Sequence, residues 1–198
     1  MRTLIVILCL ALGGCLTSGR RGGDTPPAVY DFGAFAAPAP AAGLPPLLVE
    51  VRAPSWFDGQ AIAYRLAYAE PTRLREYALA RWAGPPADLI EQRLMRVLSV
   101  VPAGQGSPRC LLRLHVQEFA QVFADAAHSH GLLEGRAVLL DHRRNPLAEL
   151  PVRVERTAPT PDSRGGVAAL SAAVGQMTEN LDAWRADLHR AGVLGQCG

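Results

Sequence analysis

Stretches in which apolar and polar side chains alternate recur along the chain, and this period of two residues is typical of half-buried β-strands. In the stretch 47–53, for example, Leu47, Val49 and Val51 fall on one face. Comparable patterns predict strands at 29–33, 61–67, 74–82, 110–123, 132–141 and 147–155. Each of these stretches is therefore expected to form a strand.

Two pairs of these strands are close enough in sequence to form antiparallel hairpins. Glu70 and Pro71 are expected to form the turn between 61–67 and 74–82. The sequence His-Arg-Arg-Asn-Pro separates the last two strands in the same way. Pro151 has no backbone donor, so we expect it at an edge or outward position of its strand.

The long strand at 110–123 changes phase along its length. Leu112, Leu114 and Val116 alternate, and the pattern then shifts near Glu118-Phe119. One extra residue on one strand of a pair produces such a shift, so we expect a β-bulge there.

A helical period replaces the alternation after Pro85 and Pro86. Prolines suit the first turn of a helix, where no amide hydrogen is needed, and Asp88 favours the positive end of the helix dipole. Pro102 ends the pattern. The apolar positions at helical spacing are Leu89, Ile90, Leu94, Val97, Leu98 and Val101.

A second helix is predicted near the carboxy terminus, after a loop at 158–166, with Gly192 placed to stop it. Its apolar stripe consists of Val167, Leu170, Val174, Met177, Leu181, Trp184 and Leu188. A coiled-coil seam has this spacing, but the chain contains no partner stripe. A helix lying across a sheet is therefore the preferred interpretation.

These elements follow one another in the order βββα-βββα. The sequence predicts an α+β fold, with one mixed or antiparallel sheet of about five to six strands covered by two main helices.

The amino terminus has the pattern of a secretory signal peptide, with Arg2 followed by a short apolar run and small residues. The small residues end in Leu12-Gly13-Gly14-Cys15, which resembles the bacterial lipobox. The resemblance implies removal of residues 1–14 and attachment of lipid to Cys15. The alternative is an ordinary signal peptide in which Cys15 is incidental.

Lipidation would make the protein membrane-anchored. Residues 15–28 are small, polar and rich in proline and glycine, so they are expected to form a flexible tether to one domain at 29–198. Leu16, and not Asp, follows the cysteine, which favours the inner leaflet of the outer membrane of a Gram-negative bacterium.

Charge gives little indication of partners. The 20 basic and 18 acidic side chains leave a net charge of +2, which offers no electrostatic case for nucleic acid. All the basic residues are arginine, so lysine nucleophiles and Schiff bases are excluded.

Two cysteines remain in the expected mature chain besides Cys15. In an oxidising compartment Cys110 and Cys197 could form a disulfide that pins the carboxy terminus to the start of a strand. The alternative is two isolated thiols.

The sequence contains no convincing catalytic or cofactor motif. No Gly-x-Ser-x-Gly occurs, and the glycines at 104–106 lack the lysine of a phosphate-binding loop. His128, His130 and His142 are the only metal-like group, and solvated loop histidines are the default interpretation. We expect no metal, no cofactor and no enzymatic activity.

Two residues separate Trp82 from the double proline, at the corner between a strand and a helix. A large ring there can fill the gap where sheet and helix diverge, and this structural role is favoured over ligand stacking. The region 54–94 resembles the ABC-type transport auxiliary lipoproteins, the PqiC/YmbA-like family. The matching residues are Ile62, Tyr64, Arg65, Tyr77, Arg81, Trp82, Pro85 and Pro86.

This resemblance implies a non-enzymatic role. Members of the family accompany MCE-type lipid-transport systems, which have an ABC permease and ATPase in the inner membrane, and are thought to dock the MCE protein at the outer membrane. The signature residues Tyr64, Arg65, Arg81, Trp82, Pro85 and Pro86 would then form a partner surface or a structural corner. A ring-like homo-oligomer would suit a ring-shaped partner, by analogy alone.

Two other functions remain open. A lipoprotein chaperone for envelope assembly would bind lipid directly and predicts an apolar groove between sheet and helices. A periplasmic lipoprotein hydrolase would need a pocket with a nucleophile or perturbed acids.

Overall fold

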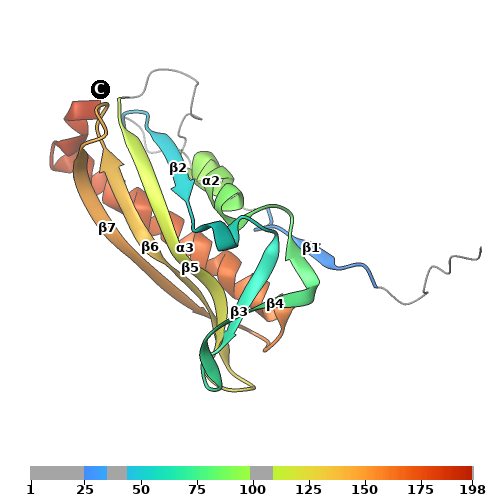
Figure 1. Ribbon diagram of the computed structural model, residues 1–198. Helices are drawn as coiled ribbons and strands as arrows, with labels where there is room; N and C mark the ends of the chain where they lie inside the picture. Colours follow the sequence, from blue (N-terminus) through green and yellow to red (C-terminus); the bar gives the residue numbers. More distant parts are fainter. Residues whose placement is uncertain (1–24, 35–43, 99–108, 198) are drawn as a thin grey trace, which may run out of the picture.

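A mixed sheet of seven strands forms the framework of the computed structural model, which describes residues 25–34, 44–98 and 109–197 (Figure 1). The strands are β1 (Ala28–Tyr30), β2 (Leu48–Arg52), β3 (Ala61–Leu66), β4 (Glu70–Trp82), β5 (Leu111–Phe123), β6 (Ser129–Leu140) and β7 (Pro146–Thr157). The helices are α2 (Pro86–Val97) and α3 (Ser163–Arg190), with short 3₁₀ turns η2 (Ser55–Phe57) and η3 (Val193–Cys197). The α+β class and the two helices are confirmed, and the sheet is slightly larger than predicted.

The strand order is β1-β4-β3-β5-β6-β7, and β2 also pairs with β5. One side of β5 carries β6 in antiparallel pairing. Its other side carries β2 along its first half and β3 along its last three residues, both in parallel. The central strand therefore joins the two βββα halves into one sheet.

The bulge predicted in the long strand is present, between Val116 and Glu118 of β5. Before it Leu114 faces the core opposite Ala137, and after it Phe119 faces the core opposite Leu133. The extra residue thus keeps apolar side chains on the buried face along the whole strand.

The first hairpin is antiparallel as predicted, but its turn lies earlier. The turn closes at Leu66, whose carbonyl accepts a hydrogen bond from Ala69, so Glu70 and Pro71 already belong to β4. The 13 residues of β4 face only six of β3, and two register shifts absorb the difference.

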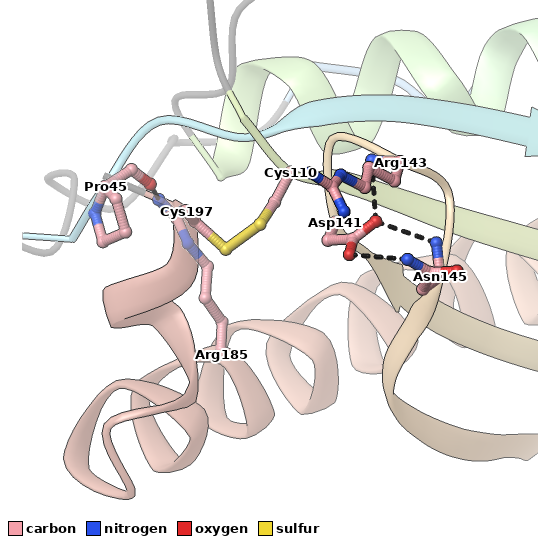
Figure 2. Close-up of a disulfide and its surroundings, with 7 residues drawn as sticks. All are labelled: Pro45, Cys110, Asp141, Arg143, Asn145, Arg185 and Cys197. Carbon is pink, nitrogen blue, oxygen red and sulfur yellow. Dashed lines mark hydrogen bonds between the residues drawn. A yellow bond between two sulfur atoms is a disulfide. The ribbon is translucent and has the colours of Figure 1, made fainter.

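The second hairpin turns at Asp141, whose carboxylate accepts hydrogen bonds from the backbone of Arg143 and Asn145 at 2.7 and 2.8 Å (Figure 2). Pro151 is exposed in β7, which among the described strands pairs with β6 alone and so forms one edge of the sheet.

Both helices cover the same face of the sheet, and one apolar core lies between them and the strands. The long helix α3 crosses β5, β6 and β7 (Figure 1). This arrangement matches the preferred prediction of a helix lying across a sheet. Gly131 of β6 permits this close approach, since a Cβ there would lie 2.7 Å from the backbone nitrogen of Leu170.

Helix boundaries differ from the sequence-based ones by a few residues. α3 begins at Ser163, four residues before Val167, because Asp162 caps it by accepting a hydrogen bond from the amide of Gly165 at 2.8 Å. Gly192, with φ of +77°, follows its last turn. α2 ends at Val97, and the expected extension through residues 99–101 lies outside the described residues.

Candidate functional site

The strand-to-helix corner around Trp82 is held by three separate strands. The Trp82 amide donates to the carbonyl of Gln60 and the Ala83 amide to that of Tyr30, both at 2.7 Å. The indole is 1% exposed and packs against Phe32 and Phe119, with ring centroids 5.3 and 5.8 Å away. Trp82 thus fills the corner from the inside.

Two prolines set the direction in which the chain leaves this corner. Pro85 occupies the N-cap position of α2 with φ −53° and ψ 136°, and it makes no side-chain cap. Pro86 is the first helical residue and is buried. Neither proline is an exposed residue, so both act by directing the chain from β4 into α2.

A cleft of about 320 Å³ opens directly outside this corner. Its walls are the segment after β1, the turn after β4 and one face of α2. The lining residues are Asp31, Phe32, Gly33, Ala83, Gly84, Asp88, Leu89, Gln92, Arg93 and Arg96. We call this the corner cleft.

Charges of both signs line the corner cleft. Asp31 and Asp88 contribute carboxylates, and Arg93 and Arg96 contribute guanidinium groups. Burial and the nearby Arg96 lower the pKa of Arg93, which nonetheless stays cationic at neutral pH. The cleft can therefore receive polar groups of either charge beside the apolar side chain of Leu89.

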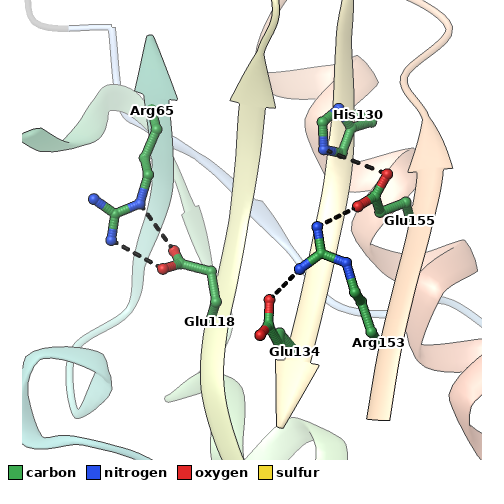
Figure 3. Close-up of polar contacts among 6 residues, drawn as sticks. All are labelled: Arg65, Glu118, His130, Glu134, Arg153 and Glu155. Atoms are coloured by element: carbon green, nitrogen blue, oxygen red, sulfur yellow. Dashed lines mark hydrogen bonds and ion pairs between the residues drawn. The ribbon is translucent and has the colours of Figure 1, made fainter. Parts of the chain in front are cut away.

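The remaining signature residues serve mainly to hold the sheet. Arg65 donates to both oxygens of Glu118, at 3.2 and 2.9 Å (Figure 3). Tyr64 packs on Tyr77, with centroids 4.7 Å apart. Of the expected partner surface, Arg81 is the residue with an exposed side chain.

A buried polar chain joins Tyr77 to the central strands. Its hydroxyl donates to Gln121 Oε1 at 2.8 Å, and Gln121 Nε2 donates to Ser129 Oγ at 2.8 Å. Burial, with smaller contributions from Tyr64 and Asp162, raises the pKa of Tyr77, so its phenol stays protonated. Such a group acts as a hydrogen-bond donor and not as a base.

The face of the sheet opposite the helices carries rows of ion pairs. Arg153 bridges Glu134 and Glu155, and His130 Nε2 lies 4.0 Å from Glu155 (Figure 3). His128 instead pairs with Asp125 in the loop before β6.

The histidines considered as metal ligands are not brought together. His142 follows the far end of β6, which begins next to His128 and His130. Among the described residues, no three His, Cys, Asp or Glu side chains form a group that could hold a metal ion.

Cys110 and Cys197 form a disulfide with Cα atoms 5.1 Å apart (Figure 2). Arg185 of α3 lies nearby and is 6% exposed. It donates to the carbonyls of Leu98 and Pro45 at 2.7 and 2.8 Å, so it joins α3, the end of α2 and the segment before β2.

The sequence patterns did not identify Arg185 as buried, nor the residues of α2 that line the corner cleft. Arg185 lies within an amphipathic pattern, where an arginine is normally assigned to the surface. The cleft residues Leu89, Gln92, Arg93 and Arg96 share helical spacing, and that spacing beside the signature corner was an available signal.

The expected lipid attachment site, Cys15, and most of the expected tether lie outside the described residues. None of the helices formed by the described residues is long and apolar enough to span a membrane.

The fold is shared with several solved structures. A protein from Xanthomonas campestris assigned to the DUF330 family has 23% sequence identity and a TM-score of 0.64, over 80% of this chain and 91% of that one. An uncharacterized protein has 16% identity and a TM-score of 0.61, over 80% of this chain and 98% of that one. No curated protein matches the chain.

The sequence model of one family covers most of the folded region. It matches residues 30–181, from the end of β1 to well within α3, and so includes the corner, the cleft and the central strands. The chain therefore belongs to the family described as the ABC-type transport auxiliary lipoprotein component.

Proposed function

We propose that the protein is a non-enzymatic docking subunit of an MCE/ABC-type lipid-transport system. Acyl chains on Cys15 would anchor it to the inner leaflet of the outer membrane, and residues 15–28 would tether a domain at 29–198 in the periplasm. Its partners would be an MCE-domain protein and the ABC permease and ATPase. The family's auxiliary role in ABC-type transport supports this proposal.

The corner cleft is the observation that carries the docking role. A buried, hydrogen-bonded corner presents a cleft of about 320 Å³ with an apolar wall and charges of both signs. Protein interfaces commonly combine such a pocket with a polar rim. Trp82 and Pro86 would contribute indirectly, by fixing the walls.

The described carboxyl groups with shifted pKa values serve structural pairing. Every described carboxyl group with a shifted pKa has it lowered, in each case beside structural hydrogen-bond partners. In Asp125, for example, the hydrogen bond from His128 is the largest cause. General acids usually need a raised pKa, so these carboxylates are suited to structural pairing.

Affinity purification from the native envelope tests the proposal. A carboxy-terminally tagged lipoprotein in mild detergent should recover an MCE-domain protein together with ABC subunits. Gln92→Trp, which fills the exposed part of the cleft, should abolish this recovery. Gln117→Trp, on the exposed surface of β5, is the matched control and should leave recovery unchanged. Recovery that is equal in both variants would exclude the cleft as the docking site.

Several copies of the lipoprotein would match a ring-shaped partner, so we also propose a homo-oligomer. The native mass of the detergent-solubilised protein tests this, and a mass of one chain would contradict it.

A groove between α3 and β7 favours direct lipid binding as a second candidate function. It measures about 330 Å³ and includes the apolar side chains of Leu150, Met177, Leu181 and Trp184. Native mass spectrometry of the purified protein should then detect bound phospholipid, and Ala183→Trp, which fills the exposed part of the groove, should remove it. Absence of bound lipid in the unmodified protein would rule this candidate out.

A further inference from the structure

Two exposed apolar side chains lie on the pair of strands next to the amino terminus. Val29 of β1 is 54% exposed and Leu79 of β4 is 63% exposed. The two strands pair in parallel, with Ala28 opposite Ala80 and Val29 opposite Arg81. Arg81 lies directly opposite Val29, and Leu79 is two residues before Arg81 on the same strand. The three side chains are therefore neighbours.

Arg81 adds a positive charge to the same surface. In-register residues of a parallel pair share a face, so its side chain lies beside that of Val29. Arg81 is exposed and makes no ion pair within the described part of the chain. Two exposed apolar groups beside a free guanidinium match the chemistry of a bilayer surface, where acyl chains lie beneath anionic phosphates.

The strand that carries Val29 lies close in sequence to the expected lipid attachment site, which places this surface near a membrane. Thr25, where the described structure begins, lies ten positions after Cys15 along the chain. Their fully extended length is at most about 33–36 Å. Of the described strands, β1 is the one nearest in sequence to the lipid anchor (Figure 1).

We propose that the surface formed by Val29, Leu79 and Arg81 rests on the bilayer that holds the lipid anchor. Val29 and Leu79 enter the headgroup region, and Arg81 contacts lipid phosphates. This contact orients the domain relative to the membrane and so fixes the direction in which the corner cleft points. The inference rests on the proposed lipidation of Cys15.

Site-specific fluorescence on the full lipoprotein tests this orientation. Acylation occupies Cys15 and the disulfide occupies Cys110 and Cys197, so an introduced cysteine is the one free thiol of the mature chain. Leu79→Cys carries an environment-sensitive dye, and the protein is reconstituted in vesicles of phosphatidylethanolamine and phosphatidylglycerol. Ala172→Cys, exposed on α3, is the matched control.

The expected result is a blue-shifted emission at position 79 that headgroup-spin-labelled lipid quenches, with neither effect at position 172. Arg81→Glu should weaken the quenching at position 79. A protein that floats with the vesicles but shows no quenching at position 79 overturns this inference and leaves the anchor intact. A protein that does not float overturns the anchor itself. A blue shift that depends on protein concentration without lipid would mean that a second copy covers the surface, which also overturns the inference.

Discussion

Trp82 is the residue on which the corner between sheet and helix depends. Its ring is 1% exposed and lies between Phe32 and Phe119, so no other side chain could fill the same volume without rearrangement. The same corner forms the inner wall of the proposed docking cleft. Stability and docking are therefore expected to be linked at this residue.

Trp82→Ala should lower the free energy of unfolding by about 3–5 kcal/mol, because it removes a buried ring and leaves a cavity. Urea titration followed by circular dichroism measures the change. Trp82→Phe, which keeps part of the ring contacts, should lose less. An unchanged melting curve combined with lost partner binding would instead assign Trp82 to the interface.

Arg185 stabilises the opposite end of α2. Its guanidinium satisfies the carbonyls of Leu98 and Pro45, and burial lowers its pKa while Asp182 opposes that effect. Arg185→Met should cost about 3 kcal/mol, because charge-assisted hydrogen bonds are lost and buried carbonyls are left unsatisfied. Arg190→Met, which removes an exposed pair with Asp187, should change stability by less than about 0.5 kcal/mol. Equal stability of the two variants would contradict the assigned role.

The burial of Trp82 can be predicted from the sequence, whereas the burial of Arg185 cannot. A tryptophan just before two prolines has few places to lie other than the corner, so its burial follows from local pattern. Arg185 is buried because α2 ends against α3, and that contact joins residues 87 positions apart. No local pattern contains this information.

At the level of elements, the start of α3 depends on Asp162. The hydrogen bond from the Gly165 amide, and then that from Thr160, lower the pKa of the Asp162 carboxyl. Asp162→Ala should destabilise the protein by about 1 kcal/mol at neutral pH.

The same cap predicts a pH dependence. Because the folded-state pKa is depressed, the stabilisation is present above the unfolded-state pKa of about 3.9 and is lost as pH falls through the folded-state value. Thermal melts between neutral and acidic pH compare the native protein with Asp162→Asn, which can still cap but does not titrate. A difference between the two that does not change with pH would contradict the assignment.

Element boundaries show where sequence patterns stop being informative. Gly165 and Gly166 are weak helix formers, which placed the predicted start of α3 too late. Gly165 is required there because a Cβ would lie 1.9 Å from the backbone oxygen of Thr160. In the first hairpin, apolar and polar side chains alternate across the register shifts of β4 as well. The pattern therefore could not show that the turn ends before Glu70.

For the whole molecule, the sequence predicted the class, the two helices and the antiparallel hairpins. The parallel pairings of β1 with β4 and of β2 and β3 with β5 join distant segments, and periodicity carries no information about them. The corner cleft likewise combines residues 31–33 and 83–84 with one face of α2, and only the folded chain brings these three walls together.

The disulfide closes the molecule between the start of the central strand and η3, across 87 residues of sequence. A cross-link over so long a loop restricts the unfolded chain strongly, so reduction should cost about 3 kcal/mol. Differential scanning calorimetry with and without reductant measures this cost. A Cys110→Ser, Cys197→Ser double variant should melt at the reduced protein's temperature and be insensitive to reductant. An unreduced protein that already melts like this variant would show that the bridge adds no stability.

Photo-crosslinking in the intact envelope tests the central claim most directly, namely that an anchored domain docks a transport partner through the corner cleft. A photoreactive amino acid replaces Gln92 in the cleft or Gln117 on β5, and mass spectrometry identifies what is captured. We predict that position 92 captures an MCE-domain or ABC-transport subunit and that position 117 does not. Correctly anchored protein that captures no such subunit from position 92 would contradict the account.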